Sequence, residues 1–193
     1  MAEVTFEQAR SALRARLGDE AVAHSLRVAD TAAELAGAYG VDPALARLAG
    51  ALHDWDRERS GEELVAAATQ AGIGVSAADL AVPYLLHART GAAGLADAFP
   101  GIAPEIVTAV DRHTVGAADM SELDMIVYLA DMVEPARHYE GVEELRDAVG
   151  VVSLAELFAL GYQHSVAHLV ETRRRIHPDT VAVWNALVAG GAR

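Results

Sequence analysis

The chain has 193 residues, of which 52% are hydrophobic and 5% aromatic, a length and composition that suit one compact domain of close-packed helices. Its formal net charge is -13 and all 15 basic residues are arginines, which excludes an extended basic face for a nucleic-acid backbone. The absence of cysteine excludes disulfides and thiolate metal sites. No apolar run approaches the ~18 residues of a membrane span, and the first residues lack a signal-peptide pattern, so we expect a cytoplasmic protein with no membrane partner.

Capping and turn residues divide the chain into about eight to ten helices with short connections and no strand-like alternation. The main predicted helices cover residues 5–17, 19–40, 43–54, 60–72, 84–98, 104–113, 121–131, 153–173 and 177–189, with shorter helical segments after residue 76 and within 132–152. Capping boxes open three of them, at Ser60, Ser121 and Ser153. Asp19 is the predicted N-cap of the second helix, and the charged segment 56–59 is expected to exit to solvent. We therefore predict an all-α helical bundle in one domain over residues 1–193, with core motifs at 24–148 and C-terminal helices at 153–189 packing on it.

Histidines and aspartates recur on the inward faces or at the ends of these apolar helices. His24 shares a face with Val28 and Thr31, at spacings of four and seven residues. The adjacent His53 and Asp54 close another helix, where two ligands can come from one short piece of backbone. A lone histidine is more commonly a packed or surface residue than a ligand, but several such groups, each costly to bury alone, favour a shared cation. The predicted metal-binding series is His24, His53, Asp54, His87, His113 and Asp131.

Five segments carry a resemblance to a known family. They are HSLRVADTAAELA from His24, LAGALHDWDRE from Leu48, LLHARTGA from Leu85, IVTAVDRHTVGAADMSELDMIVYLADMVEPAR from Ile106 and YEGVEELR from Tyr139. Over 24–148 the chain resembles the HD-domain superfamily of metal-dependent phosphohydrolases, and more narrowly its bacterial branch that hydrolyses diadenosine tetraphosphate symmetrically. The His-Asp pair is typical of the whole superfamily, whereas the long fourth segment carries the narrower resemblance.

The resemblance implies a helical bundle around a metal centre, often dinuclear and iron-containing, that cleaves diadenosine tetraphosphate to two ADP. It implies a first metal site at His24, His53, Asp54 and Asp131, and a second metal or phosphate site at His87 and His113 with Asp54 as the bridge. The implied catalytic residues are Asp54, His87 and His113. Ala136 departs from the family pattern, in which we expect an asparagine, so one hydrogen bond near the substrate is expected to be missing.

The ligand types define the chemistry of such a site. Imidazole and carboxylate suit iron, manganese, cobalt, nickel or zinc. Two cations ~3.5–4 Å apart can bind a water between them, lower its pKa and present a metal-bound hydroxide to a phosphorus atom. They would also draw a polyanionic nucleotide to a chain of net charge -13. Arg27, Arg89 and Arg137 are the predicted phosphate-binding side chains, each with the simpler alternative of a surface salt bridge.

Two alternative functions stay open at this point. One is a nucleotidase or phosphohydrolase that acts on other (deoxy)nucleotides, and the other is a non-catalytic nucleotide-binding or ribosome-assembly regulator. The complete ligand series argues against the regulator, since a binding module has no evident need for six such side chains. The expected partner is thus a nucleotide substrate and not a nucleic acid, and the sequence is compatible with a homodimer.

Other features have simpler interpretations than a functional one. His164 and His168 lie four residues apart on one helical face, but they lack the glutamate of the HExxH zinc motif. His138 is interpreted as a loop residue and His177 as a helix-start residue. Four aromatic side chains could stack on a nucleobase, although packing in the core is the simpler interpretation of each. They are Trp55, Tyr84, Tyr128 and Tyr139.

Overall fold

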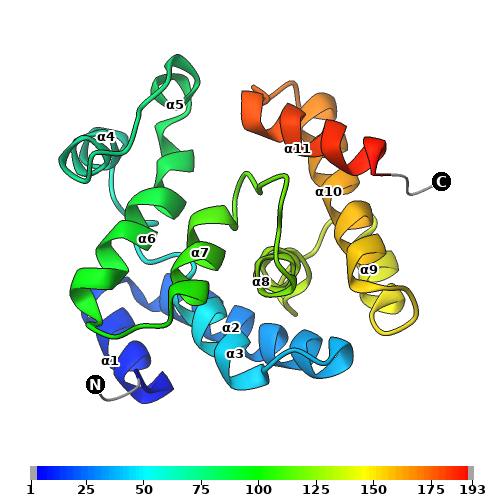
Figure 1. Cartoon of the computed structure of the whole chain (residues 1–193), viewed down its shortest axis with the longest axis horizontal. Helices are drawn as coiled ribbons and strands as arrows, with labels where there is room; N and C mark the ends of the chain where they lie inside the picture. Colours follow the sequence, from blue (N-terminus) through cyan, green and yellow to red (C-terminus); the bar gives the residue numbers. More distant parts are fainter. Residues whose placement is uncertain (1–3, 191–193) are drawn as a thin grey trace.

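The computed structural model describes residues 4–190, which form eleven α-helices, one 3-10 helix and no strand (Figure 1). The helices are α1 (Phe6–Arg16), α2 (Asp19–Tyr39), α3 (Pro43–Leu52), α4 (Gly61–Gln70), α5 (Ala77–Ala81), the 3-10 helix η1 (Pro83–Leu85), α6 (Leu86–Ala98), α7 (Pro104–Arg112), α8 (Glu122–Val133), α9 (Val142–Ala148), α10 (Leu154–Glu171) and α11 (Pro178–Ala189). The predicted all-α class is confirmed. The count exceeds the eight to ten expected because the short segments α5 and α9 are also complete α-helices.

Local capping chemistry sets most helix starts where the sequence predicted them. The predicted capping boxes are present at Ser60, Ser121 and Ser153. The start of α2 differs, because its N-cap is Gly18 and Asp19 is already the first helical residue. No side chain caps the first turn of α2, but Oε2 of Glu58, which is distant in sequence, accepts the backbone N–H of Gly18 at 2.9 Å. Tyr84 lies in η1, so α6 begins only at Leu86.

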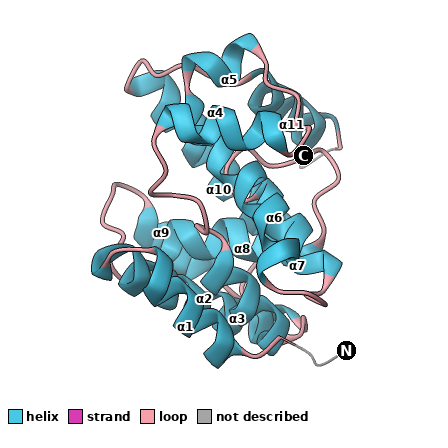
Figure 2. Cartoon of the chain, turned by 90° about the vertical axis from the view of Figure 1, so that its left-hand side faces the viewer, coloured by secondary structure: helices cyan, strands magenta, loops and turns pink. Residues whose placement is uncertain are grey.

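Helices α2, α3, α7 and α8 pack against one another and form the core of the bundle. In Figures 1 and 2, α1, α2 and α3 lie at one end and α4, α5 and α11 at the other. At Gly50 of α3, a Cβ would lie 3.0 Å from Cβ of Ala32 and 3.0 Å from the backbone oxygen of Val28, both in α2. Only glycine allows this close approach, which brings the end of α3, with His53, next to α2.

The C-terminal helices are attached to this helical core through α8. The ring of Tyr128 in α8 lies 5.3 Å from that of Phe158 and 5.6 Å from that of Tyr162, both in α10. Gly161 of α10 faces Leu129, and a Cβ there would lie 2.9 Å from its Cδ2. A separate hydrophobic cluster, which joins α4 to α6, comprises Leu64, Ala68 and Leu86. Within residues 4–190, no helix is both long enough and apolar enough to span a membrane.

Candidate metal centre

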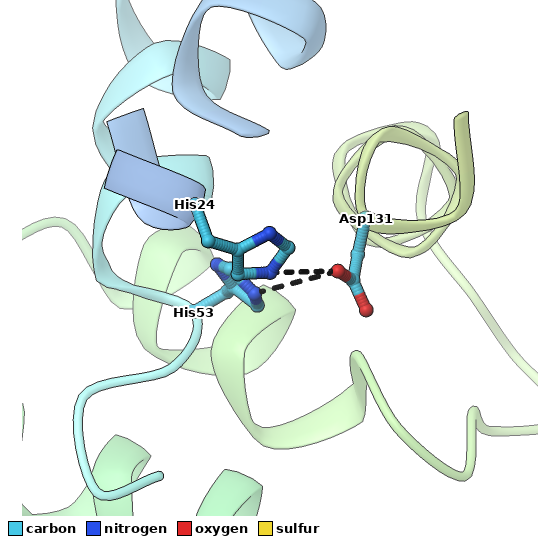
Figure 3. A group of neighbouring side chains, drawn as sticks. All are labelled: His24, His53 and Asp131. Carbon is cyan, nitrogen blue, oxygen red and sulfur yellow. Dashed lines mark ion pairs between the residues drawn. The ribbon is translucent and has the colours of Figure 1, made fainter. Parts of the chain in front are cut away.

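Six histidine and aspartate side chains from five helices or helix ends meet in one cluster between the two ends of the molecule. They are His24 on α2, His53 and Asp54 at the end of α3, His87 in the first turn of α6, His113 at the end of α7, and Asp131 on α8. Figure 3 shows His24, His53 and Asp131 pointing toward one another from three of these elements. The whole predicted ligand series therefore lies together, in a largely buried position.

The carboxylate of Asp54 lies between two groups of imidazoles. Its Oδ2 is 3.2 Å from Nε2 of His53 and 3.6 Å from Nε2 of His24. Its Oδ1 is 3.1 Å from Nε2 of His87 and 3.6 Å from Nε2 of His113. Each oxygen faces its own pair of histidines, which is the arrangement of a carboxylate that can bridge two cations.

Asp131 completes the first of these groups, which consists of His24, His53, Asp131 and Oδ2 of Asp54. Its Oδ1 is 3.0 Å from Nε2 of His24 and 3.8 Å from Nε2 of His53 (Figure 3). Burial alone would raise the pKa of Asp131, but the adjacent imidazole of His24 and the charges of His53 and Arg137 lower it below its ordinary range. The second group consists of His87, His113 and Oδ1 of Asp54.

The most deeply buried histidines are oriented by their Nδ1 atoms, which face backbone carbonyl oxygens. The pairs are His53 with Gly50 at 2.8 Å, His87 with Tyr84 at 2.6 Å, and His113 with Val110 at 2.7 Å. A carbonyl oxygen only accepts, so Nδ1 carries the hydrogen and Nε2 of the neutral ring presents its lone pair to the cluster. Metal-bound histidines are held in the same way, with the second nitrogen on a carbonyl or carboxylate.

Several buried atoms that face the centre of the cluster lie within ion-pair distance of charged neighbours but form no hydrogen bond of normal geometry among the described residues. They are Nε2 of His24, Nε2 of His53 and Oδ2 of Asp54. In the second group, Nε2 of His87 and Nε2 of His113 lie only 3.1 Å apart, and burial lowers the pKa of His113, which favours the neutral ring. Unpaired buried polar atoms are costly, whereas a cation in each group would bind all of them. The donor set therefore fits divalent metal ions.

Charge within the cluster favours the same interpretation. Burial alone would raise the pKa of Asp54, but the imidazoles of His53, His113 and His87 beside it keep that pKa well below its ordinary value. Burial alone would lower the pKa of His53, yet the Asp54 carboxylate beside it raises that pKa overall. Asp54 is therefore an anion at the centre of a buried site, as a bridging ligand must be.

Glu134 is a residue that the sequence reasoning missed. It is 2% exposed, and its Oε1 lies 3.2 Å from Nδ1 of His24. Its Oε2 accepts hydrogen bonds from Nε of Arg27 and from the backbone N–H of Ala136, both at 2.7 Å. Burial alone would raise the pKa of Glu134, but these bonds, that of Arg27 first, lower it. The available signal was its position three residues after Asp131, one turn along α8.

Arg57 is a second missed residue, and the expectation that segment 56–59 exits to solvent is wrong for its first half. Asp56 is 2% exposed and ion-paired, and Nη1 of Arg57 lies 3.1 Å from Oδ2 of Asp54. The guanidinium of Arg57 lies 5.5 Å from the ring centroid of Tyr84. The chain turns tightly after α3, since the Arg57 N–H donates to the Asp54 carbonyl at 3.0 Å, and this turn brings the arginine back to the cluster.

Two cavities open beside the cluster. The smaller, of about 480 Å³, reaches His24 and Arg27. The larger, of about 600 Å³, reaches His87 and His113. Both are lined by Arg57, Tyr84 and Arg137. The cluster is therefore accessible from two sides, with arginines at the junction.

Two of the three predicted phosphate-binding arginines line a cavity beside the cluster, and the third does not. Arg27 and Arg137 line the smaller cavity, and Arg137 also pairs with the Asp131 carboxylate and donates to its backbone oxygen at 2.8 Å. Arg89 lies apart, with its Nη1 3.7 Å from Asp79, and it lines neither cavity. Its predicted role is therefore the least supported of the three.

The remaining histidines and aromatic residues lie outside the ligand cluster. His164 and His168 line a separate cavity of about 700 Å³ together with glutamates, although His168 also reaches the larger cavity beside the cluster. His138 is exposed, and His177 is the N-cap of α11. The aromatic side chains divide into Trp55 and Tyr128, which are buried, and Tyr84 and Tyr139, which are about two-fifths exposed.

A family model of the HD domain matches residues 21–136, which hold all six side chains of the cluster. The chain therefore belongs to the HD domain family, as the sequence resemblance predicted. The HD domain and the His/Asp cluster together indicate a divalent metal.

Similar proteins of known sequence and structure indicate which branch of the HD domain family this chain resembles. A protein from Bacillus subtilis is 30% identical over 95% of this chain and 98% of its own length, and one from Halalkalibacterium halodurans is 30% identical over 86% and 87%. Both are named symmetrical bis(5'-nucleosyl)-tetraphosphatase. A solved structure from Clostridium acetobutylicum, described as a predicted HD superfamily hydrolase involved in NAD metabolism, has a TM-score of 0.89 and 31% identity, covering 98% of this chain and 100% of that one. Within the HD domain family, this chain is thus similar over nearly its full length to symmetrical tetraphosphatases.

Proposed function

We propose that this protein hydrolyses diadenosine tetraphosphate symmetrically to two molecules of ADP. The observation that carries the proposal is the position of Asp54, whose two oxygens face separate pairs of histidines. The name of the relatives supplies the substrate, and the cluster supplies a centre suited to metal-dependent hydrolysis of a phosphate anhydride. A free nucleotide, rather than a nucleic acid, suits a chain of net charge -13 with arginines gathered in two cavities.

We propose two divalent cations for the site, with iron as the first candidate and manganese, cobalt, nickel and zinc as alternatives. The first group would hold one cation and the second group the other, with Asp54 shared between them. Imidazole nitrogen and carboxylate oxygen are ligands that all these metals accept. When bound, the cations supply a water of lowered pKa and neutralise charge on the phosphate oxygens.

The protein's own groups would bind and orient the substrate at this centre. Asp54, His87 and His113 are the proposed catalytic residues, because the two histidines line the larger cavity and Asp54 joins both groups. Arg57 and Arg137 lie at the junction of the cavities, each paired with a carboxylate of the cluster. Phosphate oxygens that enter there would take over part of this pairing, so these arginines are placed to hold the central phosphates.

Symmetrical hydrolysis adds one water across the central P–O–P bond. The water oxygen joins one central phosphorus and the bridging oxygen leaves with the other half, so that each ADP gains a terminal phosphate; full ionisation of the two new phosphates releases the two protons of the water. ADP is then the sole product. The test is to incubate the metal-loaded protein with diadenosine tetraphosphate and to separate the products by ion exchange. AMP together with ATP, or no turnover beside rapid hydrolysis of nucleoside monophosphates, would overturn the proposal and favour a different phosphohydrolase.

A further inference from the structure

The connection between α10 and α11 forms part of the wall of the larger cavity. Arg174, Arg175 and His177 line this cavity, whose other lining residues include His87 and His113 of the metal-binding cluster. The loop therefore carries positive charge into the same space that reaches the candidate metal centre. The neighbouring Arg173 lines none of the cavities described here, and its φ of 54° marks the turn of the chain.

The side chains of Arg174 and Arg175 are unpaired cations within the described part of the chain. Within residues 4–190, neither forms an ion pair or a side-chain hydrogen bond, whereas Arg57 and Arg137 are both paired with carboxylates. Two adjacent unpaired arginines at a cavity are unusual in a chain of net charge -13, in which acidic partners are abundant. Guanidinium groups of this kind are suited to bind phosphate oxygens, often through two parallel hydrogen bonds.

The loop is held in place by one contact distant in sequence and one local hydrogen bond. Nε2 of His177 lies 3.3 Å from Oδ1 of Asp79, a carboxylate that is 4% exposed. The backbone N–H of Arg174 donates to the carbonyl of Leu169 at 2.8 Å. The His177 contact joins the start of α11 to α5, which lie on facing sides at the top of Figure 1. The two arginines therefore project from a fixed loop rather than from a free end.

The two cavities match the symmetry of the proposed substrate. A dinucleotide cut at its centre has one nucleoside diphosphate on each side of the scissile bond. Cavities of about 480 and 600 Å³ lie beside the cluster and share Arg57 and Arg137, and both volumes fall in the range of small-molecule sites. The smaller has Arg27 as a further arginine, and the larger has Arg174 and Arg175.

We propose that Arg174 and Arg175 form a second nucleotide subsite, in which they bind phosphate oxygens of the ADP half that occupies the larger cavity. The apolar wall of Val82, Leu85 and Leu169 in this cavity receives the base of that half. The two arginines are thus specificity residues that select a substrate with two nucleotide halves. This inference rests on the proposed function for the identity of the ligand, but ADP binding tests it separately from hydrolysis.

The test is calorimetric titration of the metal-loaded protein with ADP, for the wild type and for Arg174→Ala/Arg175→Ala. The matched control is Arg14→Ala/Arg173→Gly, which also removes two exposed arginines that, among residues 4–190, form no ion pair and line none of these cavities. We expect two ADP per chain in the wild type and in the control. In the Arg174/Arg175 variant, one ADP should keep its affinity and the other should bind at least about 10-fold more weakly, the effect of losing a charge-assisted hydrogen bond.

The same variant should show at least about a 10-fold lower kcat/KM for diadenosine tetraphosphate than the control. A single ADP site in the wild type, or equal ADP binding in the variant and the control, would overturn the subsite. An equal weakening of both ADP sites would also overturn it, since it would indicate a general loss of structure or charge. If one ADP site is lost in the variant while the wild type leaves diadenosine tetraphosphate intact, the subsite stands and the proposed function fails.

Discussion

The Nδ1 atom of His24 lies 3.2 Å from the carboxylate of Glu134, whereas the other three histidines of the cluster face backbone carbonyl oxygens. Glu134 also holds Arg27 through two hydrogen bonds. One buried carboxylate therefore orients both a proposed metal ligand and a proposed phosphate-binding side chain. A substitution at Glu134 should therefore weaken both metal binding and substrate binding.

We expect Glu134→Gln to lower metal affinity by about 10- to 100-fold, because the amide is a weaker partner for His24 and leaves Arg27 without its anion. Titration of the metal-free protein with the cation measures this. Glu62→Gln, an exposed carboxylate in the first turn of α4, is the control and should leave the affinity unchanged. Equal affinity in the two variants would show that Glu134 does not orient His24.

The bridging position of Asp54 predicts a specific pattern of metal content. Asp54→Asn should reduce metal binding in both groups, whereas His113→Ala should remove one equivalent and leave the first group occupied. Both should lower activity by more than the roughly 10- to 100-fold typical of a residue outside the ligand set. Elemental analysis of protein purified without chelator measures the content. His164→Ala, outside the cluster, should change nothing, and loss of a full equivalent in it would place the metal elsewhere.

The contact between α5 and the start of α11 predicts a pH-dependent stability. Burial alone would raise the pKa of Asp79, but hydrogen bonds from Ser76 and the charges of His177 and Arg89 lower it. A lowered carboxyl pKa stabilises the fold above the unfolded value of about 3.9, and this contribution is lost as pH falls through the folded pKa. Asp79→Asn should therefore reduce the free energy of unfolding by about 1–2 kcal/mol at about pH 7, and by less as pH falls below about 4.

Urea denaturation over this pH range measures the effect. The control is Asp97→Asn, which changes an exposed carboxylate of α6 that forms no ion pair within the described residues. It should have little effect at any pH. A difference between wild type and Asp79→Asn that is as large at low pH as at neutral pH would contradict the electrostatic account.

The close approach of α2 and α3 predicts the effect of a single methyl group. Gly50→Ala would place a Cβ 3.0 Å from Ala32 and Val28, so we expect a loss of about 1–3 kcal/mol in the free energy of unfolding. The displacement should also separate His53 from His24 and weaken metal binding. Thermal unfolding with and without metal measures both. Gly37→Ala is the control, because nothing lies within 4 Å of its Cβ and the change should stabilise α2 by about 0.5–1 kcal/mol.

Much of this fold could be predicted because its signals are local. The capping box at Ser121 sets the start of α8, and helical periodicity then places Asp131 on its inward face. In the same way, the end of the apolar run before His53 places the His-Asp pair at a helix end. Each of the six predicted ligands could be recognised from the pattern of its own helix. Only the fold shows that these six side chains meet at one point.

The sequence by itself thus determined the all-α class, nearly all the helix boundaries and the six members of the His/Asp cluster, since caps, periodicity and residue type act over a few residues. Only the tertiary structure decided which charged groups surround that cluster. The pairing of Arg27 with Glu134 joins positions 107 residues apart, and the contact of His177 with Asp79 joins the start of α11 to α5. Such pairings depend on how the helices pack, and no local spacing encodes them, which is why Glu134 and the arginines after α10 emerged only from the structure. Arg57 is only three residues from Asp54, but the tight turn that brings it back to the cluster was not predicted.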